Sequence, residues 1–285
     1  MGTHNGHERR APLTETPSPP GSPPLARLDT TTAHPARMWN YWLGGKDHYR
    51  ADREVADQVI AAYPSIREVA RASRACLGRM VTCLAAEEGI RQFLDIGTGL
   101  PTTGNTHEAA QQAASGSKVV YVDNDPLVLV HARALLTSGP EGACGYIDCD
   151  VRDPGRILGE AGEILDFTRP VALIMFGIMG NVVDDDEAAA IVRCLAGALA
   201  PGSFLALNDG TGQLDRKGRE EAIRIGVEQG STPYVARTPG QIAGFFDGLE
   251  LVEPGVVSTS FWRAEATPSG TPQEVDSTCG LARKP

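Results

Sequence analysis

The chain has 285 residues, of which 41% are hydrophobic and 22% charged, and its formal net charge is −10. This composition is ordinary for a globular protein, and the length allows one large α/β domain with a sizeable core. The acidic balance argues against a nucleic-acid partner, because proteins that bind phosphate backbones need a basic face. No apolar run approaches the roughly 20 residues that span a bilayer, so no membrane partner is expected.

The two ends of the chain are predicted to lie outside the folded domain. Residues 1–33 are rich in proline and lack apolar periodicity, which predicts a disordered arm. Residues 266–285 open with a proline- and glycine-containing run and are predicted to form a flexible tail, leaving residues 34–265 as the domain. Six cysteines without a C-x-x-C pair or histidines at zinc spacing predict reduced thiols, a cytoplasmic location and no metal site.

The first part of this domain has helical patterning. Helices are expected over Pro35–Leu43, over Arg53–Ala62 and from Ser65 to near Gly89. The pair Gly44-Gly45 closes the first helix, because glycine accepts the left-handed conformation of a helix end. Residues 34–90 are therefore expected to form a helical cap or lid.

From Gln92 onward, expected strands alternate with expected helices. The strands are near-continuous apolar runs, which is typical of a parallel sheet covered on both faces. They cover Gln92–Ile96, Lys118–Val122, Cys144–Asp148, Val171–Gly177 and Ser203–Asp209. The helices between and after them cover Thr106–Ser115, Pro126–Thr137, Pro154–Leu165, Asp185–Leu199 and Leu214–Glu228, with a short one opening at Thr238.

A glycine-rich turn follows the first of these strands. Asp95 precedes Gly97-Thr98-Gly99, but Thr102 stands where a dinucleotide-binding turn has its third glycine. A carboxylate there would repel a pyrophosphate, whereas it suits the ammonium group of an amino-acid moiety. Asp123, at the end of the second strand, is placed to accept hydrogen bonds from ribose hydroxyls. The pattern favours S-adenosylmethionine over NAD, with contacts at Asp95, Gly97, Thr98, Gly99 and Asp123.

The chain is expected to end its sheet with a hairpin. Leu249–Val252 and Val256–Ala264 are separated by a Glu-Pro-Gly turn, so the last strand should run antiparallel to its partner. The predicted fold is a Rossmann-like α/β fold of the class I methyltransferase type. Its sheet has seven strands, mostly parallel, with an antiparallel last strand and an N-terminal helical cap.

Several ordered phrases of the sequence resemble one known family. The run Trp39–Tyr49 reads W-N-Y-W-L-G-G-K-D-H-Y, and further matching phrases cover residues 91–103, 105–108, 119–126, 131–136 and 245–255. In this order they resemble the actinobacterial S-adenosylmethionine-dependent methyltransferases long catalogued as a domain of unknown function. The resemblance extends from about Pro35 to Arg263 and implies that cofactor together with a methyl acceptor.

The sequence departs from the family at one place. Members often carry a His-Phe pair after the fourth strand, beside the transferable methyl group, whereas this chain reads Met179-Gly180-Asn181-Val182-Val183. The difference points to a changed acceptor or to altered activity.

Further candidates follow the second, third and fourth strands. Asn124 is placed to pack against adenine, and Asp150 resembles the acid that meets the adenine amino group, with Val151 beside it. A helix-start acid acting together with Asp153 is the alternative for Asp150. Phe176 completes the cofactor set. The acidic run 184–187 is interpreted as a helix start rather than a metal site, and no general base is assigned.

The family run before Arg50 suggests a lid over the cofactor. Aromatic residues at helical spacing usually belong to a core, but the polar, glycine-containing segment after Trp42 has no evident folding role. The lid hypothesis places Tyr41, Trp42, Lys46, Asp47 and Tyr49 near the cofactor or the acceptor. An aromatic face there would favour the cationic sulfur.

The predicted function is methyl transfer from S-adenosylmethionine to a small molecule or a protein. Two alternatives stay open on the sequence: a non-catalytic sensor of S-adenosylmethionine or S-adenosylhomocysteine, and an NAD-linked oxidoreductase.

Overall fold

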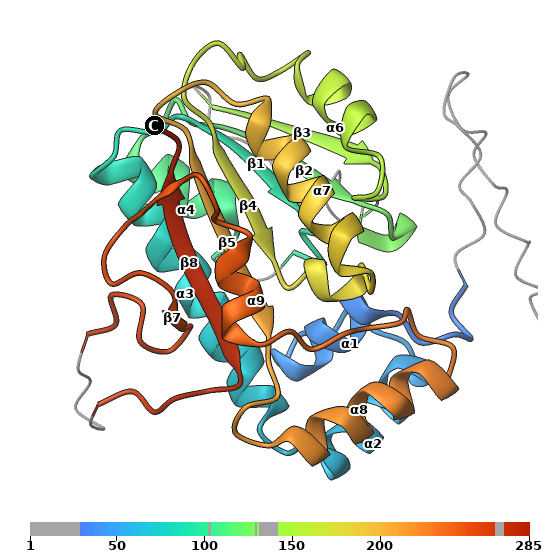
Figure 1. Ribbon diagram of the computed structural model, residues 1–285. Coiled ribbons are helices and arrows are strands. Elements are labelled where there is room, and N and C mark those ends of the chain that lie inside the picture. Colours follow the sequence, from blue (N-terminus) through green and yellow to red (C-terminus); the bar gives the residue numbers. More distant parts are fainter. Residues whose placement is uncertain (1–28, 102–103, 129, 131–141, 266–270) are drawn as a thin grey trace, which may run out of the picture.

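An eight-stranded sheet forms the centre of the computed structural model, which describes residues 29–101, 104–128, 130, 142–265 and 271–285 (Figure 1). Its strand order is β3-β2-β1-β4-β5-β8-β6, and β7 also pairs with β8. The pairs among β1 to β5 are parallel, and every pair made by β8 is antiparallel. The strands are β1 (Gln92–Ile96), β2 (Lys118–Asp123), β3 (Ala143–Asp148), β4 (Ala172–Phe176), β5 (Phe204–Gly210), β6 (Glu250–Leu251), β7 (Val257–Ser258) and β8 (Ser277–Arg283).

Helices cover both faces of this sheet, and each face has its own apolar core. One core joins the strands to α6 (Pro154–Ala161), α7 (Asp185–Gly197) and α9 (Pro239–Gly244). The other joins them to α3 (Ile66–Ala86) and α4 (Thr106–Ala113). Figure 1 shows α7 and α9 in front of the sheet and α3 behind it. The predicted class I methyltransferase architecture is therefore confirmed, with eight strands in place of seven.

Side-chain caps explain where several of these helices begin. The Asp153 carboxylate accepts a hydrogen bond from the Arg156 backbone N–H, and Pro154 occupies the first turn of α6. Asn105 and Glu108 form a reciprocal capping box at α4. The expected helix Pro126–Thr137 falls largely outside the described residues.

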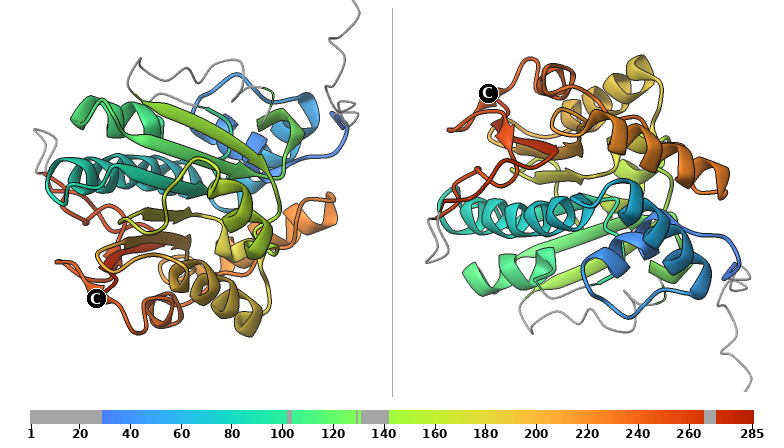
Figure 2. Two further views of the ribbon diagram at one scale, coloured as in Figure 1. Left: turned by 90° about the horizontal axis from the view of Figure 1, so that it is seen from above. Right: turned by 90° about the horizontal axis from the view of Figure 1, so that it is seen from below.

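A cap of helices lies across one end of the sheet. It contains α1 (Pro35–Trp42), α2 (Arg50–Ala62) and α8 (Arg216–Glu228), which share a third apolar core with the first turns of α3 (Figure 2). The predicted cap, residues 34–90, was wrong in extent. Most of α3 covers the sheet, because Cys76–Ala85 pack on the strands, and α8 joins the cap from far along the chain.

The predicted flexible tail is wrong for the residues that form β8. This strand pairs along its whole length with β5, from Phe204 opposite Arg283 to Gly210 opposite Ser277. Small residues suit this position because neighbours crowd it: a Cβ at Gly280 would lie 2.7 Å from the Phe246 ring. Residues 266–270, in the first part of the expected tail, lie outside the described residues.

The predicted hairpin is wrong as well. β6 and β7 do not pair with each other, and each pairs with β8 instead. The antiparallel last strand is thus real, but it is formed by β8. The expected arm falls mostly on residues 1–28, outside the described residues, while Ala33 in the described part is buried in the cap core.

Candidate functional site

A cavity lies at the carboxyl edge of the parallel strands, between the sheet and the cap. The ends of β1, β2 and β4 and the segment after β3 form one side of it, and α1 and α3 form the other. Parallel strands end at a common edge, so groups that follow different strands come together there. All nine residues predicted to contact the cofactor line this cavity: Asp95, Gly97, Thr98, Gly99, Asp123, Asn124, Asp150, Val151 and Phe176.

The turn after β1 brings backbone close to this cavity. Gly97 and Gly99 have φ values of 74° and 66°, a region that favours glycine. A Cβ at Gly97 would lie 2.8 Å from Ile178, so no larger residue fits without a shift. The Gly97 N–H donates to the Val122 carbonyl at 2.9 Å, which fixes the turn against β2.

Asp95 is a buried carboxylate at the base of the turn. Its Oδ2 accepts a hydrogen bond of 2.6 Å from the Thr106 hydroxyl. Burial raises the pKa of Asp95 to about 6, although Thr106 and the charge of Arg74 act to lower it and Asp123 acts to raise it. The Arg74 Nη2 donates to Asn105 at 3.1 Å, while its Nε has no hydrogen-bond partner among the described residues. The cavity is thus lined by a carboxylate and a guanidinium of opposite charge.

Asp123 is held rigidly at the end of β2. Its Oδ2 accepts from the Gly99 N–H at 2.8 Å, and its Oδ1 accepts from the Asp125 N–H at 2.9 Å. Burial raises the pKa of Asp123, while these two N–H donors act to lower it. Each carboxylate oxygen has a second lone pair, so the group retains acceptor capacity toward the cavity.

Asp150 belongs to the cavity rather than to the start of α6. Its Oδ2 accepts from the Asn124 amide at 3.2 Å, and its Oδ1 accepts from the Arg152 N–H at 2.9 Å. The side chain that caps α6 is Asp153. Of the two interpretations of Asp150, its position favours the one at the cofactor edge.

Several residues that line the cavity were not predicted. From the cap they include His34, Trp39, Asn40 and Leu43, and from α3 they include Ser73, Arg74 and Leu77. Arg152 and Asn181 come from the sheet side. The sequence carried one usable signal for α1, since Trp39 and Leu43 are four residues apart and therefore share a helix face.

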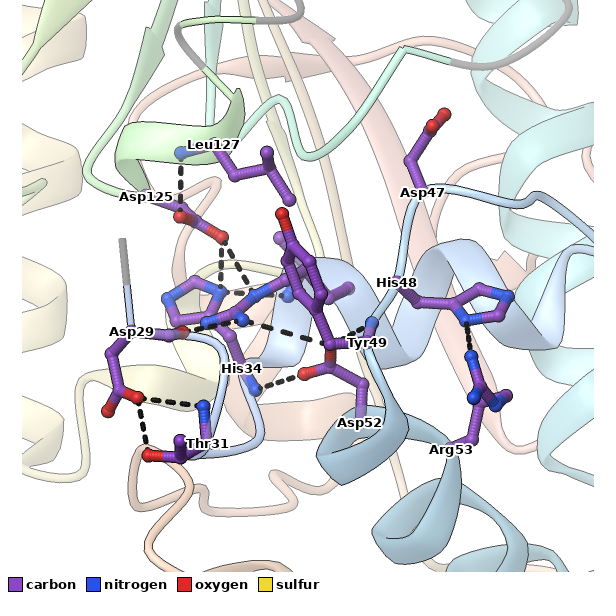
Figure 3. Close-up of polar contacts among 12 residues, drawn as sticks. Asp29, Thr31, His34, Asp47, His48, Tyr49, Asp52, Arg53, Asp125 and Leu127 are labelled. Carbon is purple, nitrogen blue, oxygen red and sulfur yellow. Dashed lines mark hydrogen bonds and ion pairs between the residues drawn. The ribbon is translucent and has the colours of Figure 1, made fainter. Parts of the chain in front are cut away.

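The five lid candidates do not line this cavity. The Tyr41 hydroxyl donates to Asp57 at 2.8 Å, and Trp42 is buried in the cap core, where it lines a second cavity. Tyr49 immediately precedes α2, and Asp47 lies in the loop between α1 and α2 (Figure 3). Lys46, in the same loop, is exposed. The first cavity is lined instead by Trp39 and Leu43 of the same segment, so the lid hypothesis is corrected for the cofactor; for the acceptor it stays a prediction, and Trp42 lines the second cavity.

The glycine pair after α1 has a folding role. Gly44 has a φ of 83°, which a helix end of this kind requires. A Cβ at Gly45 would lie 2.4 Å from the Asn40 side chain, whose Oδ1 accepts a hydrogen bond from the Asp47 N–H at 3.0 Å. The tight packing of this loop explains the glycines without a moving lid.

A second cavity adjoins the first. The two share five lining residues, namely Pro35, Trp39, Gly177, Asn181 and Thr232. Its walls are mostly apolar and come from the cap helices, including Met38, Trp42, Val59, Ile66, Val69 and Ile223. Its volume is about 120 Å³, against about 200 Å³ for the first cavity. A small ligand would therefore lie directly beside whatever occupies the first cavity.

The segment that departs from the family forms the short 3-10 helix η1 (Met179–Asn181) between the two cavities. Gly180 lies against the ring of Tyr234, and Asn181 lines both cavities. The Tyr234 hydroxyl donates to Asp209 at 2.6 Å. The missing side chain at position 180 thus makes room for a tyrosine beside the second cavity.

Replacing Gly180 with alanine is expected to lower the free energy of unfolding by about 1–3 kcal/mol. The added Cβ would lie 2.3 Å from the Tyr234 ring. Gly197→Ala is the matched control, because Gly197 is an exposed residue of α7 and nothing lies within 4 Å of its Cβ position. This substitution should be neutral or should stabilise the protein by up to about 1 kcal/mol. Urea denaturation measures the free energy of unfolding of both variants. Equal values would show that the Tyr234 ring moves aside without cost.

The acidic run before α7 is a helix start, as predicted. The Asp184 Oδ1 accepts from the Glu187 N–H at 2.8 Å. Asp185 has a further contact that was not predicted, an ion pair of 2.8 Å with the buried guanidinium of Arg237.

The glycine turn after β1, the acids at the ends of neighbouring strands and the reversed last strand define a class I S-adenosylmethionine-dependent methyltransferase. The chain belongs to the S-adenosyl methyltransferase family, whose model matches residues 22–285. Its cofactor is S-adenosylmethionine and its substrate is a methyl acceptor. The NAD-linked alternative is thereby excluded.

Two solved structures are close to this chain. One is a DUF574 family protein from Streptomyces avermitilis, with 43% identity over 91% of this chain and 100% of that one and a TM-score of 0.87. The other is a candidate methyltransferase from Thermobifida fusca, with 40% identity over 92% and 98% and a TM-score of 0.82. Both come from actinobacteria, as the sequence resemblance implied.

A methyltransferase from Anabaena variabilis shares the fold alone, with 14% identity over 88% of this chain and 95% of that one and a TM-score of 0.50. No curated protein matches the sequence. Within the described ranges, no helix combines the length and apolarity needed to cross a bilayer.

Proposed function

We propose that the first cavity binds S-adenosylmethionine through three acids at or just after the carboxyl ends of neighbouring strands. Asp123 would accept hydrogen bonds from the ribose hydroxyls, and Asp150 with Asn124 and Val151 would hold the adenine. The observation that carries this assignment is the convergence of Asp95, Asp123 and Asp150 on one cavity. Three acids at this edge suit a nucleoside that carries no phosphate, because their carboxylates would repel a phosphate.

The methionine end would lie on the turn Gly97–Gly99. Asp95 offers a carboxylate for its ammonium group, and the unpartnered Nε of buried Arg74 offers a donor for its carboxylate. Thr98 and Phe176 would pack beside it. Because an ammonium and a carboxylate are joined at one carbon in an amino acid, adjacent groups of opposite charge are the complement it needs.

The acceptor would occupy the second cavity. S-adenosylmethionine supplies an already activated methyl group, so the residues of this chain need mainly to align the acceptor and exclude water. The apolar cap helices do both, because they form most of the walls. A cavity of about 120 Å³ beside the cofactor, walled mostly by apolar side chains, favours a small molecule over a protein segment or a nucleic acid, and favours catalysis over sensing.

A cytoplasmic location is part of the same proposal. All six cysteines are free, including Cys76 and Cys279, whose sulfur atoms are 3.5 Å apart. Six free cysteines fit a reducing compartment, where thiols persist.

The pH dependence of cofactor binding tests the role of Asp95. Below its pKa of about 6 the group is increasingly protonated and loses its attraction for an ammonium ion. The affinity for S-adenosylmethionine should fall about tenfold between pH 7 and pH 5, measured by titration calorimetry. Asp95→Asn should bind more weakly and abolish this slope, whereas exposed Asp186→Asn should retain it.

Stability should respond in the opposite direction. Because the pKa of Asp95 is raised above its unfolded value, its contribution to the stability of the free protein is greatest below about pH 4 and is lost as the pH rises through about 6. A wild-type affinity for S-adenosylmethionine that does not change from pH 7 to pH 5 would show that Asp95 does not bind the cofactor.

A transfer assay distinguishes an enzyme from a non-catalytic sensor. An enzyme should transfer labelled methyl groups to small molecules of a cell extract, and a sensor should not.

A further inference from the structure

The second cavity has a polar end as well as apolar walls. Asn208, Arg219, Tyr234 and Ser277 line it, and none of them lines the first cavity. Three are almost completely buried, with exposed fractions of 2% for Asn208, 8% for Arg219 and 1% for Ser277. Buried polar groups are costly unless they are paired, so their partners decide what the cavity is built to hold.

Arg219 is a buried cation that lies over two aromatic rings. Its guanidinium lies 4.7 Å from the centre of the Tyr234 ring and 5.6 Å from that of Tyr63. Its Nε has no hydrogen-bond partner, and no ion pair joins it to a carboxylate of the described chain. By contrast, buried Arg237 pairs with Asp185 and donates to the carbonyls of Met179 and Val182. Arg219 is therefore left with donors for a ligand.

One buried acid, Asp209, interacts electrostatically with Arg219 but makes its hydrogen bonds to other groups through one oxygen. Asp209 accepts through its Oδ1 from the Tyr234 hydroxyl at 2.6 Å and from the Gly210 N–H at 3.0 Å. Burial raises the pKa of Asp209, although Tyr234, the Gly210 N–H and Arg219 act to lower it. Tyr234 thus contacts both groups, whereas no hydrogen bond or ion pair joins Asp209 to Arg219 among the described residues, and the Asp209 Oδ2 is buried without a hydrogen-bond partner.

Asn208 supplies a complementary acceptor. Its Nδ2 donates to the hydroxyls of Ser73 and Ser277, each at 2.9 Å, which fixes the orientation of the amide. The remaining atom, Oδ1, is buried and has no partner. A ligand that carries an N–H or O–H group would satisfy it.

We infer that the methyl acceptor is a small, largely apolar organic carboxylate, whose anionic group pairs with Arg219 and whose N–H or O–H donates to Asn208. This rests on the proposed function, since it takes the second cavity as the acceptor site. A carboxylate is favoured over a phosphate because the cavity offers one unpaired cation among apolar walls, which matches a single negative charge. A planar guanidinium also fits a carboxylate through two parallel hydrogen bonds.

Binding of matched acids and amides to the protein loaded with S-adenosylhomocysteine tests this inference. The probes are benzoate, 4-hydroxybenzoate and indole-3-acetate, each compared with its primary amide by titration calorimetry. We expect the acids to bind about tenfold or more tightly than the amides. Arg219→Gln should remove that preference, and Arg219→Lys should keep part of it because the charge remains.

Arg224→Gln is the matched control. Arg224 lies on the exposed side of the same helix and pairs with Glu221 and Glu228, so its loss should leave the preference unchanged. If no acid binds the loaded wild type, or if the amides bind equally well, the inference is overturned. Failure of S-adenosylhomocysteine itself to bind the wild type would instead overturn the assignment of the first cavity. Retained binding of it by Arg219→Gln shows that this variant is folded.

Discussion

Replacing Asp123 with asparagine is expected to weaken the binding of S-adenosylmethionine about tenfold to a hundredfold. A neutral amide accepts hydrogen bonds from the two ribose hydroxyls more weakly than a carboxylate does, which in a partly dry site should cost about 1–3 kcal/mol of binding free energy. Asparagine is preferable to alanine, because the carboxylate also accepts from the N–H groups of Gly99 and Asp125. An amide oxygen retains part of that role, so the turn after β1 should survive. Titration calorimetry at pH 7 measures the effect.

Asp186→Asn is the control for this experiment. Asp186 is exposed in the first turn of α7, away from both cavities, and its replacement should leave the affinity unchanged. Asp185 is a poorer control than its place in the sequence suggests, because it pairs with buried Arg237. Normal affinity in Asp123→Asn, together with reduced affinity in Asp186→Asn, would mean that the ribose binds elsewhere.

The cofactor side of the site could be predicted because it depends on strand ends. Asp95 and Asp123 lie at the ends of two strands and Asp150 comes just after a third; all three strands are recognisable as apolar runs, and parallel strands bring their carboxyl ends to one edge. No knowledge of side-chain packing is needed for that step. This is why all the predicted cofactor residues line one cavity although they extend from Asp95 to Phe176 in the sequence.

The acceptor side could not be predicted in the same way. Its walls come from α1, α2, α3 and α8, which meet only through tertiary packing, and α8 follows α2 by more than a hundred residues. The unpaired state of Arg219 is invisible in the sequence, because it depends on which acids lie near it in space. The unpaired Oδ1 of Asn208 is likewise invisible in the sequence, because the orientation of the amide depends on its hydrogen bonds to Ser73 and Ser277.

Strand β8 escaped prediction for a different reason. Its residues Ser277–Arg283 are mostly small and carry no alternating apolar pattern, yet six of the seven are buried. The strand gains its place from neighbours on both sides, β5 on one and β6 and β7 on the other. A pattern that measures hydrophobicity along the chain does not detect a strand whose crowded position demands small side chains.

The cap is joined to the cofactor edge by a buried charge network. Arg37 on α1 lies 3.4 Å from the Asp125 Oδ2 and 3.8 Å from the Asp52 Oδ2, and its Nη1 donates to the Asp29 carbonyl at 2.9 Å. The backbone N–H of His34 donates to Asp52, and the His34 ring lies 3.0 Å from the Asp125 carboxylate (Figure 3). Both acids are buried, and Asp125 lies two residues after Asp123. Arg37 is therefore the permanent cation between two buried carboxylates.

Replacing Arg37 with methionine is expected to lower the free energy of unfolding by about 3–5 kcal/mol at pH 7, because two buried acids lose their shared cation. Replacing exposed Arg53 of α2 with methionine should change the free energy of unfolding by less than about 0.5 kcal/mol.

The effect of Arg37→Met should depend on pH. Although burial acts to raise the pKa of Asp125, His34, the Leu127 N–H and Arg37 lower it below its usual value. Its contribution is thus present above about pH 4 and is lost at lower pH, so the difference between wild type and Arg37→Met should shrink in acid. Urea denaturation at pH 7 and pH 3 measures this; equal losses for Arg37→Met and Arg53→Met would show that the network does not hold the cap.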